Sequence, residues 1–238
     1  MHRPTSLAGL LLLLLCVTQN AAAADTLRAQ EIVQCLPGEV QTWGDGRDQP
    51  AESSTLNFVL DSQGAPAWFD EATVLQTVQK AATAWAACGV AAHVSAATSA
   101  DAKASSSAVG SVRIAWSESG SGGNMAQANL GQRSLLLNPA GFALLRKVNP
   151  KHDARETLQM VVSHEMGHFF GVIAHSRRCV DVTSYYDDGK GQQCSIRGGG
   201  QRQPGVEYRA TLPTACDIAR CRAANGLDAK PLLPLNRN

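Results

Sequence analysis

The sequence predicts an α+β domain, and three observations support that class. A strand-like run and an amphipathic helix come first, and several short strands follow them. A second long helix comes after these strands instead of alternating with them. Beyond Gly171 the chain is rich in glycine and polar residues, which predicts an irregular remainder.

The individual elements follow from the spacing of apolar residues. Strands are predicted over 55–60, 91–96, 111–116, 125–130 and 134–137. Helices are predicted over 71–87, 139–149 and 213–224. A further long helix is predicted to open at Asp153, where Glu156 three residues later completes a capping box. The stretches 97–108 and 117–124 indicate surface connections, and Trp85 is expected in the core.

The most informative stretch is His164-Glu165-Met166-Gly167-His168 on that long helix. Residues four apart share one helix face, so the imidazoles of His164 and His168 can reach one metal ion. Glu165 lies about 100° around the helix, where it can address a water on that metal. Gly171 can end the helix in a left-handed conformation, and the chain can then return His175 to the same metal.

These residues resemble the metzincin zinc metalloproteases, most closely their matrixin and snapalysin-like branches. The family pattern is His-Glu-x-x-His-x-x-Gly-x-x-His or Asp, followed by a tight turn that carries methionine. The segment 181–186 is similar to that turn. The resemblance covers about residues 54–225, with specific motifs over 164–186. It implies a zincin-like fold, with a mixed twisted sheet on two long helices and a small irregular C-terminal subdomain.

The chain departs from the family pattern at two positions. The third ligand of the family aligns with Ala174, which cannot bind a metal, and the histidine comes one residue later, at His175. We expect His175 to be the ligand, because a one-residue insertion in a loop is easily absorbed. Thr183 stands where the family has methionine under the zinc, so the floor of the site is either looser or uses an added hydrogen bond.

The resemblance implies a zinc-dependent endopeptidase acting on protein or peptide substrates. One catalytic Zn²⁺ would be held by His164, His168 and His175, and Glu165 would be the general base for a zinc-activated water. Tyr185 either stabilises the oxyanion, as a tyrosine there does in some relatives, or only packs in the turn. The edge strand of the family pairs with substrate, and 125–130 is the equivalent here.

Two other functions remain open at this point. The chain could be a catalytically weak or inactive zinc-binding protein that acts as a binding module on the same fold, since Ala174 and Thr183 depart from the pattern. It could also be a zinc hydrolase with a substrate other than a peptide. The intact Glu165 favours an enzyme, because zinc binding alone does not require it. Nothing in the sequence indicates a structural Ca²⁺ site.

The N-terminus has the features of a secretory signal peptide. An apolar run from Leu10 to Val17 precedes small residues at 22–24, and the run is shorter than the roughly 20 residues that span a membrane. The sequence predicts a signal peptide over 1–24, an irregular N-terminal segment over 25–53, a metalloprotease catalytic domain over 54–225 and a tail over 226–238. We expect the protein to be secreted, into the periplasm or the extracellular space.

The charge and composition of the chain restrict the classes of partner that we expect the protein to bind. The chain has 21 basic and 20 acidic residues, and removal of residues 1–24 takes away only Arg3, which leaves 20 of each. This balance offers no basic surface for nucleic acid or for a membrane. We expect a monomer whose partner is its substrate.

The cysteines predict disulfides. Seven are present, and without Cys16 in the signal peptide six remain, an even number typical of an exported chain. Proximity in the sequence favours the pairs Cys179–Cys194 and Cys216–Cys221, which leaves Cys35–Cys88. No Cys-x-x-Cys pair is present to indicate a second metal site.

Overall fold

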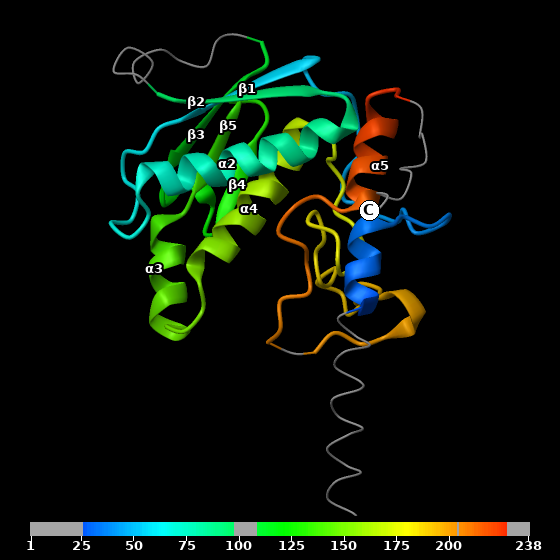
Figure 1. Cartoon of the computed structure of the whole chain (residues 1–238). Helices are drawn as coiled ribbons and strands as arrows, with labels where there is room; N and C mark the ends of the chain where they lie inside the picture. Colours follow the sequence, from blue (N-terminus) through cyan, green and yellow to red (C-terminus); the bar gives the residue numbers. More distant parts are fainter. Residues whose placement is uncertain (1–25, 98–108, 204, 228–238) are drawn as a thin grey trace, which may run out of the picture.

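The computed structural model describes residues 26–97, 109–203 and 205–227. The predicted signal peptide, most of the connection 97–108 and the end of the tail lie outside this part. Within it the α+β class is confirmed: a five-stranded mixed sheet is combined with several helices (Figure 1).

The sheet has the strand order β2-β1-β3-β5-β4. Four strands run parallel, and β4 pairs antiparallel with β5 at one edge. Their bounds are β1 Thr55–Leu60, β2 Ala91–Ala96, β3 Ser111–Trp116, β4 Ala126–Asn129 and β5 Ser134–Leu137. Leu56, Phe58 and Leu60 alternate into the core along β1, as expected when one face of a sheet is buried. All five strands were predicted, with β4 one residue shorter at each end.

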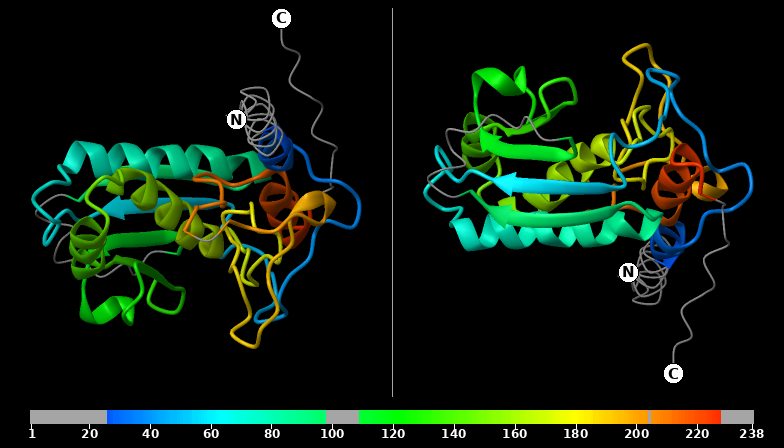
Figure 2. Two further views of the ribbon diagram at one scale, coloured as in Figure 1. Left: turned by 90° about the horizontal axis from the view of Figure 1, so that it is seen from below. Right: turned by 90° about the horizontal axis from the view of Figure 1, so that it is seen from above.

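Two long helices, α2 (Glu71–Trp85) and α4 (Ala154–Phe169), lie on the same face of the sheet, as the views of Figure 2 show. Trp85 is fully buried where they meet, as predicted, and its Nε1 donates a hydrogen bond to the carbonyl of Ser163 at 2.8 Å. A Cβ on Gly167 would lie 2.6 Å from the Trp85 ring. The glycine inside the histidine motif therefore permits the close approach of the two helices.

The other helices are short. They are α3 (Pro139–Val148), α5 (Ala215–Ala224) and the 3₁₀ turns η1 (Ala86–Cys88), η3 (Ser119–Ser121) and η4 (Arg197–Gly199). Asp153 caps α4 as predicted, but its carboxylate accepts from Arg155 N and no capping-box bond from Glu156 accompanies it. The capping box belongs to α5, between Thr214 and Asp217. In the described part, no helix combines the length and apolar character that crossing a membrane requires.

The N-terminal segment differs from the prediction. It was expected to be irregular throughout 25–53, but residues 26–33 are helical. Glu31 on this helix is buried and lies against the C-terminal part, where it accepts hydrogen bonds from Arg197 N and Tyr208 Oη. Tertiary contacts therefore stabilise a helix too short to be stable alone. In Figure 1 this segment (blue) lies beside α5 and the irregular residues that follow α4.

The described residues contain three disulfides, and one predicted pairing is correct. Cys179–Cys194 is confirmed, whereas Cys35 pairs with Cys216 and Cys88 pairs with Cys221. The predicted Cys216–Cys221 bridge fails because both residues lie on α5. Five residues on a helix turn through about 140° net, so the two side chains point to different sides. The observed Cys35–Cys216 bridge links the N-terminal segment to α5, and the Cys88–Cys221 bridge links α5 to η1, directly after α2.

Candidate metal centre and its pocket

Helix α4 positions the first two histidines, and its C-terminal cap positions the second of them. Gly171 has φ +99°, the left-handed conformation predicted for it, and a Cβ there would lie 2.1 Å from Gln49 O. Gly171 N donates to His168 O and Val172 N donates to Gly167 O, which is the bonding of a Schellman cap. The cap places Val172 O 2.8 Å from His168 Nδ1. The turn that ends the helix therefore also fixes the histidine ring.

The structure brings His164, His168 and His175 together. One ring nitrogen from each lies within 4.8 Å of the others. The ring centroids are 5.1 Å apart for the two pairs that include His175 and 5.3 Å for His164 with His168. His175 comes from the loop after the helix, as predicted.

Each ring presents its Nε2 atom because Nδ1 is already engaged. Nδ1 of His164 bonds Val182 O at 2.8 Å, and Nδ1 of His175 bonds Asp45 Oδ2 at 2.6 Å. Carbonyl and carboxylate oxygens only accept, so Nδ1 is the donor in all three rings. A neutral imidazole with a proton on Nδ1 carries a lone pair on Nε2.

The rings are neutral at pH 7. Burial, with the neighbouring His168 and His175, holds the pKa of His164 well below its usual range. Burial lowers the pKa of His168 to about 4 and also lowers that of His175, against its hydrogen bond with Asp45. His175 Nε2 is buried and has no hydrogen-bond partner. A buried lone pair without a donor is costly unless a cation lies beside it, and the other two rings present ring nitrogens within 4.8 Å, so these residues fit a divalent metal such as Zn²⁺.

Glu165 faces the same pocket from the next position on α4. Its Oε2 accepts a hydrogen bond of 2.7 Å from the backbone N–H of Ala128, on the edge strand β4. Burial raises the pKa of Glu165 to about 7, and the bond from Ala128 opposes that rise. The carboxyl group therefore has the pKa of a group that exchanges protons near neutral pH.

The pocket in front of the histidines has a volume of about 360 Å³. Residues of β4 line it together with Tyr185 and Arg209. The ring of Tyr185 stacks on His175, with 3.6 Å between centroids and 12° between planes. Burial first, and then the charge of Glu165, raise the pKa of Tyr185. Tyr185 thus both packs on a histidine and lines the pocket, so the two roles predicted for it are compatible.

The N-terminal segment holds the loop that carries His175. Asp45 accepts from both the backbone N–H and Nδ1 of His175, at 2.9 and 2.6 Å. Burial raises the pKa of Asp45, but these bonds outweigh it and leave the net pKa below its usual range. Asp48 accepts from the N–H groups of Ile173 and Ala174, at 2.8 and 3.0 Å. A carboxylate that orients a histidine in this way also increases its basicity toward a metal.

Arg220 on α5 also holds the loop that carries His175. Its guanidinium is almost fully buried and donates to both oxygens of Asp48 and to Ala174 O. Ala174, the position aligned with the family's third ligand, is itself buried. Its N–H donates to Asp48, and its carbonyl accepts from Arg220. Its role here is therefore to anchor the loop, one residue before the histidine that reaches the centre.

Thr183 forms the floor beneath α4. It is fully buried, and its methyl group would lie 3.3 Å from a Cβ on Gly167. Its hydroxyl donates to Asp217 at 2.6 Å and accepts from Arg220 at 3.3 Å. Of the two predicted forms of this floor, the one with an added hydrogen bond is present. Asp217 also accepts from Val182 N, whose carbonyl holds His164.

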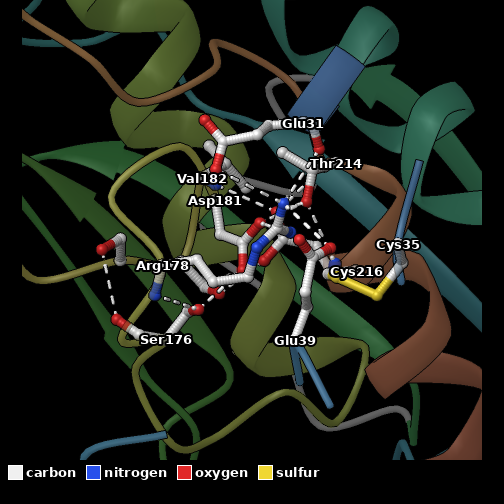
Figure 3. A network of polar contacts seen from close by, with 12 residues as sticks. Glu31, Cys35, Glu39, Ser176, Arg178, Asp181, Val182, Thr214 and Cys216 are labelled. Carbon is white, nitrogen blue, oxygen red and sulfur yellow. Dashed lines mark hydrogen bonds and ion pairs between the residues drawn. A yellow bond between two sulfur atoms is a disulfide. The ribbon is translucent and has the colours of Figure 1, made fainter. Parts of the chain in front are cut away.

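A buried polar network supports this floor (Figure 3). Asp181 accepts from Arg178 at 2.8 Å, from Ser176 at 2.6 Å and from Thr214 at 2.6 Å. Burial, with the nearby Asp217 carboxylate, raises the pKa of Asp181 to about 7. The disulfide Cys35–Cys216 lies at the edge of the network. A fully bonded network of this kind rigidifies the turn that carries Val182 and Thr183.

Sequence reasoning missed the residues that hold the site together. Asp45, Asp48, Asp217 and Arg220, with Arg209 on the pocket wall, lie in segments expected to be irregular or in a short helix, and only Asp217 belongs to a motif, the capping box of α5. For Asp45 and Asp48, the available signal in the sequence was a pair of carboxylates three residues apart in a glycine-containing stretch. That signal is weak, because such stretches are common in exposed turns.

Comparison with known proteins adds little. No model of a known protein family matches the chain, and no curated protein matches it. Among the solved structures that match, the GM1-bound form of the ECX AB5 holotoxin has a TM-score of 0.41 and 9% sequence identity. The match covers 81% of this chain and 92% of that chain. A likeness of this size carries no argument about function, so the argument stays with the site.

Proposed function

We propose that the protein is a secreted zinc-dependent endopeptidase of the metzincin type, with a zincin-like fold over residues 54–225. One observation carries the proposal: three neutral imidazoles offer Nε2 lone pairs to one point, beside a glutamate whose pKa is about 7. Metal binding alone would not require that glutamate. Three disulfides and the predicted signal peptide favour an extracellular or periplasmic location.

The residues of the chain divide the work of peptide hydrolysis. When bound to the three histidines, Zn²⁺ would lower the pKa of a water and polarise the scissile carbonyl. Ionised Glu165 accepts a proton from the attacking water as the carbon–oxygen bond forms. It then delivers that proton to the leaving amine as the carbon–nitrogen bond breaks. Tyr185, which lines the pocket and stacks on His175, would donate to the oxygen on which negative charge develops.

The edge strand β4 is the proposed place for the substrate backbone. It pairs with β5, and no other described strand pairs with its second edge, where an extended peptide would add as a further strand. The backbone of residues 126–128 lines the same pocket as the histidines. A peptide bond held there would lie next to Glu165, which is itself bonded to Ala128 N.

A catalytically weak zinc-binding protein is the second candidate. Its motivation is the replacement of the family's methionine by Thr183. The bonds of Thr183 to Asp217 and Arg220 reduce that motivation, because the floor is packed and bonded. A zinc hydrolase with another substrate would use the same metal centre. Only the unpaired edge of β4 favours a peptide substrate over this alternative.

Metal analysis combined with cleavage of a protein substrate such as casein tests the proposal. We expect about one zinc per chain and measurable cleavage. Glu165→Gln should keep the zinc and lower turnover by about 100-fold or more, because the general base is lost. Glu156→Gln, an exposed glutamate on the same helix, is the control and should change neither quantity.

His175→Ala completes the test and should lose most of the zinc. Unchanged turnover in Glu165→Gln would remove this residue from the mechanism. Stoichiometric zinc without cleavage of any protein would favour the binding module instead. A panel of ester and amide substrates would then separate it from a hydrolase of another class.

A further inference from the structure

Arg209 is a positively charged residue on the pocket wall that the proposed chemistry does not use. It lies in the irregular segment before α5 and lines the pocket together with His164 and Tyr185. Met160 and Val161 line the same pocket one helical turn before His164. The lining of the metal centre's pocket therefore includes apolar side chains and one guanidinium.

The side chain of Arg209 is held in one orientation. Its Nε and Nη2 donate to the two carboxylate oxygens of Glu207, each at 2.9 Å. The guanidinium carbon lies 4.8 Å from the ring centroid of Tyr186, and Arg28 donates to the Arg209 carbonyl at 2.7 Å. A guanidinium fixed in this way loses little conformational freedom when a ligand binds it.

One nitrogen of this guanidinium, Nη1, donates to no acceptor among the described residues. Arg202 lies on the same Tyr186 ring, 4.0 Å from its centroid, but it does not line the pocket.

We propose, building on the peptidase function, that Arg209 selects peptides with an aspartate or glutamate next to the scissile bond. The N–H groups on Nη1 would donate to the side-chain carboxylate, and Met160 and Val161 would contact its methylene groups. Hydrogen bonds to a charged acceptor are about twice as strong as neutral ones, so glutamine should bind less well than glutamate. Lysine in the same place would be repelled.

Peptides that differ only at the two residues flanking the cleaved bond test this directly. With glutamate, glutamine or lysine at each position in turn, kcat/KM of the wild type should favour glutamate over glutamine by about 10-fold or more at one position. Arg209→Gln should abolish the preference by lowering kcat/KM for the glutamate peptide, and Arg209→Lys should retain part of it. Arg202→Gln is the matched control, and its preference should match the wild type.

A binding measurement separates this inference from the peptidase function. Hydroxamate-capped peptides with glutamate or glutamine beside the metal-chelating group are titrated calorimetrically into wild type and Arg209→Gln. Tighter binding of the glutamate probe by the wild type alone supports the Arg209 site, even if no peptide is cleaved and the proposed function fails. Equal binding of the two probes, or cleavage without a charge preference, overturns the assignment while leaving the peptidase function standing.

Discussion

The metal centre has two halves that are built by different means. His164, Glu165 and His168 lie on α4, which is stabilised by burial of its apolar face against α2 and the sheet. His175 lies on a loop without regular structure and is held by hydrogen bonds to Asp45. The comparison shows that a helix supplies geometry through local periodicity, whereas a loop needs charged groups from distant segments to fix it.

The two halves also differ in what would disturb them. Contacts of the helix half are largely apolar and numerous, so no single one is decisive, apart from the approach of Gly167 to Trp85. The loop half depends on a few buried polar contacts, chiefly those of Asp48 and Arg220. Removal of one charged partner from such a set leaves the other buried without compensation.

The largest effect is expected from Arg220→Met. It leaves the Asp48 carboxylate and Ala174 O without their buried donor, and we expect a loss of about 3–5 kcal/mol in the free energy of unfolding. Urea unfolding measures the loss, and amide exchange should show opening of 172–177 while α4 stays protected. Arg155→Met, which removes an exposed arginine from α4, should cost less than about 0.5 kcal/mol. Equal loss of protection in α4 and the loop would contradict the division into two halves.

A selective effect on the metal is expected from Asp45→Asn. The variant loses the carboxylate that orients His175, and zinc affinity should fall by about 10–100-fold. Competition with a chromophoric chelator measures the affinity. The metal-free protein should change in stability by less than about 1 kcal/mol, because Asp45 is near the surface. Asp187→Asn, in an exposed turn, serves as the control. An unchanged affinity would show that the loop positions His175 without this carboxylate.

The smallest effect is a pH-dependent stabilisation in the helix half. Folding raises the pKa of Glu165 from 4.5 to about 7, so its favourable contribution is complete below the lower value and is lost as the pH rises through the higher one. Metal-free Glu165→Gln cannot ionise there and should be more stable than the wild type at about pH 8, by about 1–2 kcal/mol after allowance for the open pocket.

Urea unfolding of the metal-free proteins at two pH values measures this difference. It should disappear near pH 4, where both proteins carry a neutral group at this position. Glu156→Gln should show no such dependence. A stability difference that is the same at both pH values would indicate a change in packing and not the titration of Glu165.

The sequence alone determined the elements and the helix half of the site. The five strands, the long helices and the left-handed Gly171 follow from apolar spacing and from the conformational freedom of glycine, which are properties of neighbouring residues. The i, i+4 spacing of His164 and His168 likewise places both rings on one face of α4 before any tertiary contact forms.

Only the tertiary structure decided the loop half, the disulfide partners and the pocket wall. Asp45 and His175 are 130 residues apart, and Arg220 and Asp48 are 172 apart. Contacts at such separations leave no periodic trace in the sequence, so proximity along the chain misled the pairing of Cys216 and Cys221, which share one helix but face different sides. Arg209 belongs to the site for the same reason, because only folding brings its irregular segment to the pocket that the histidines line.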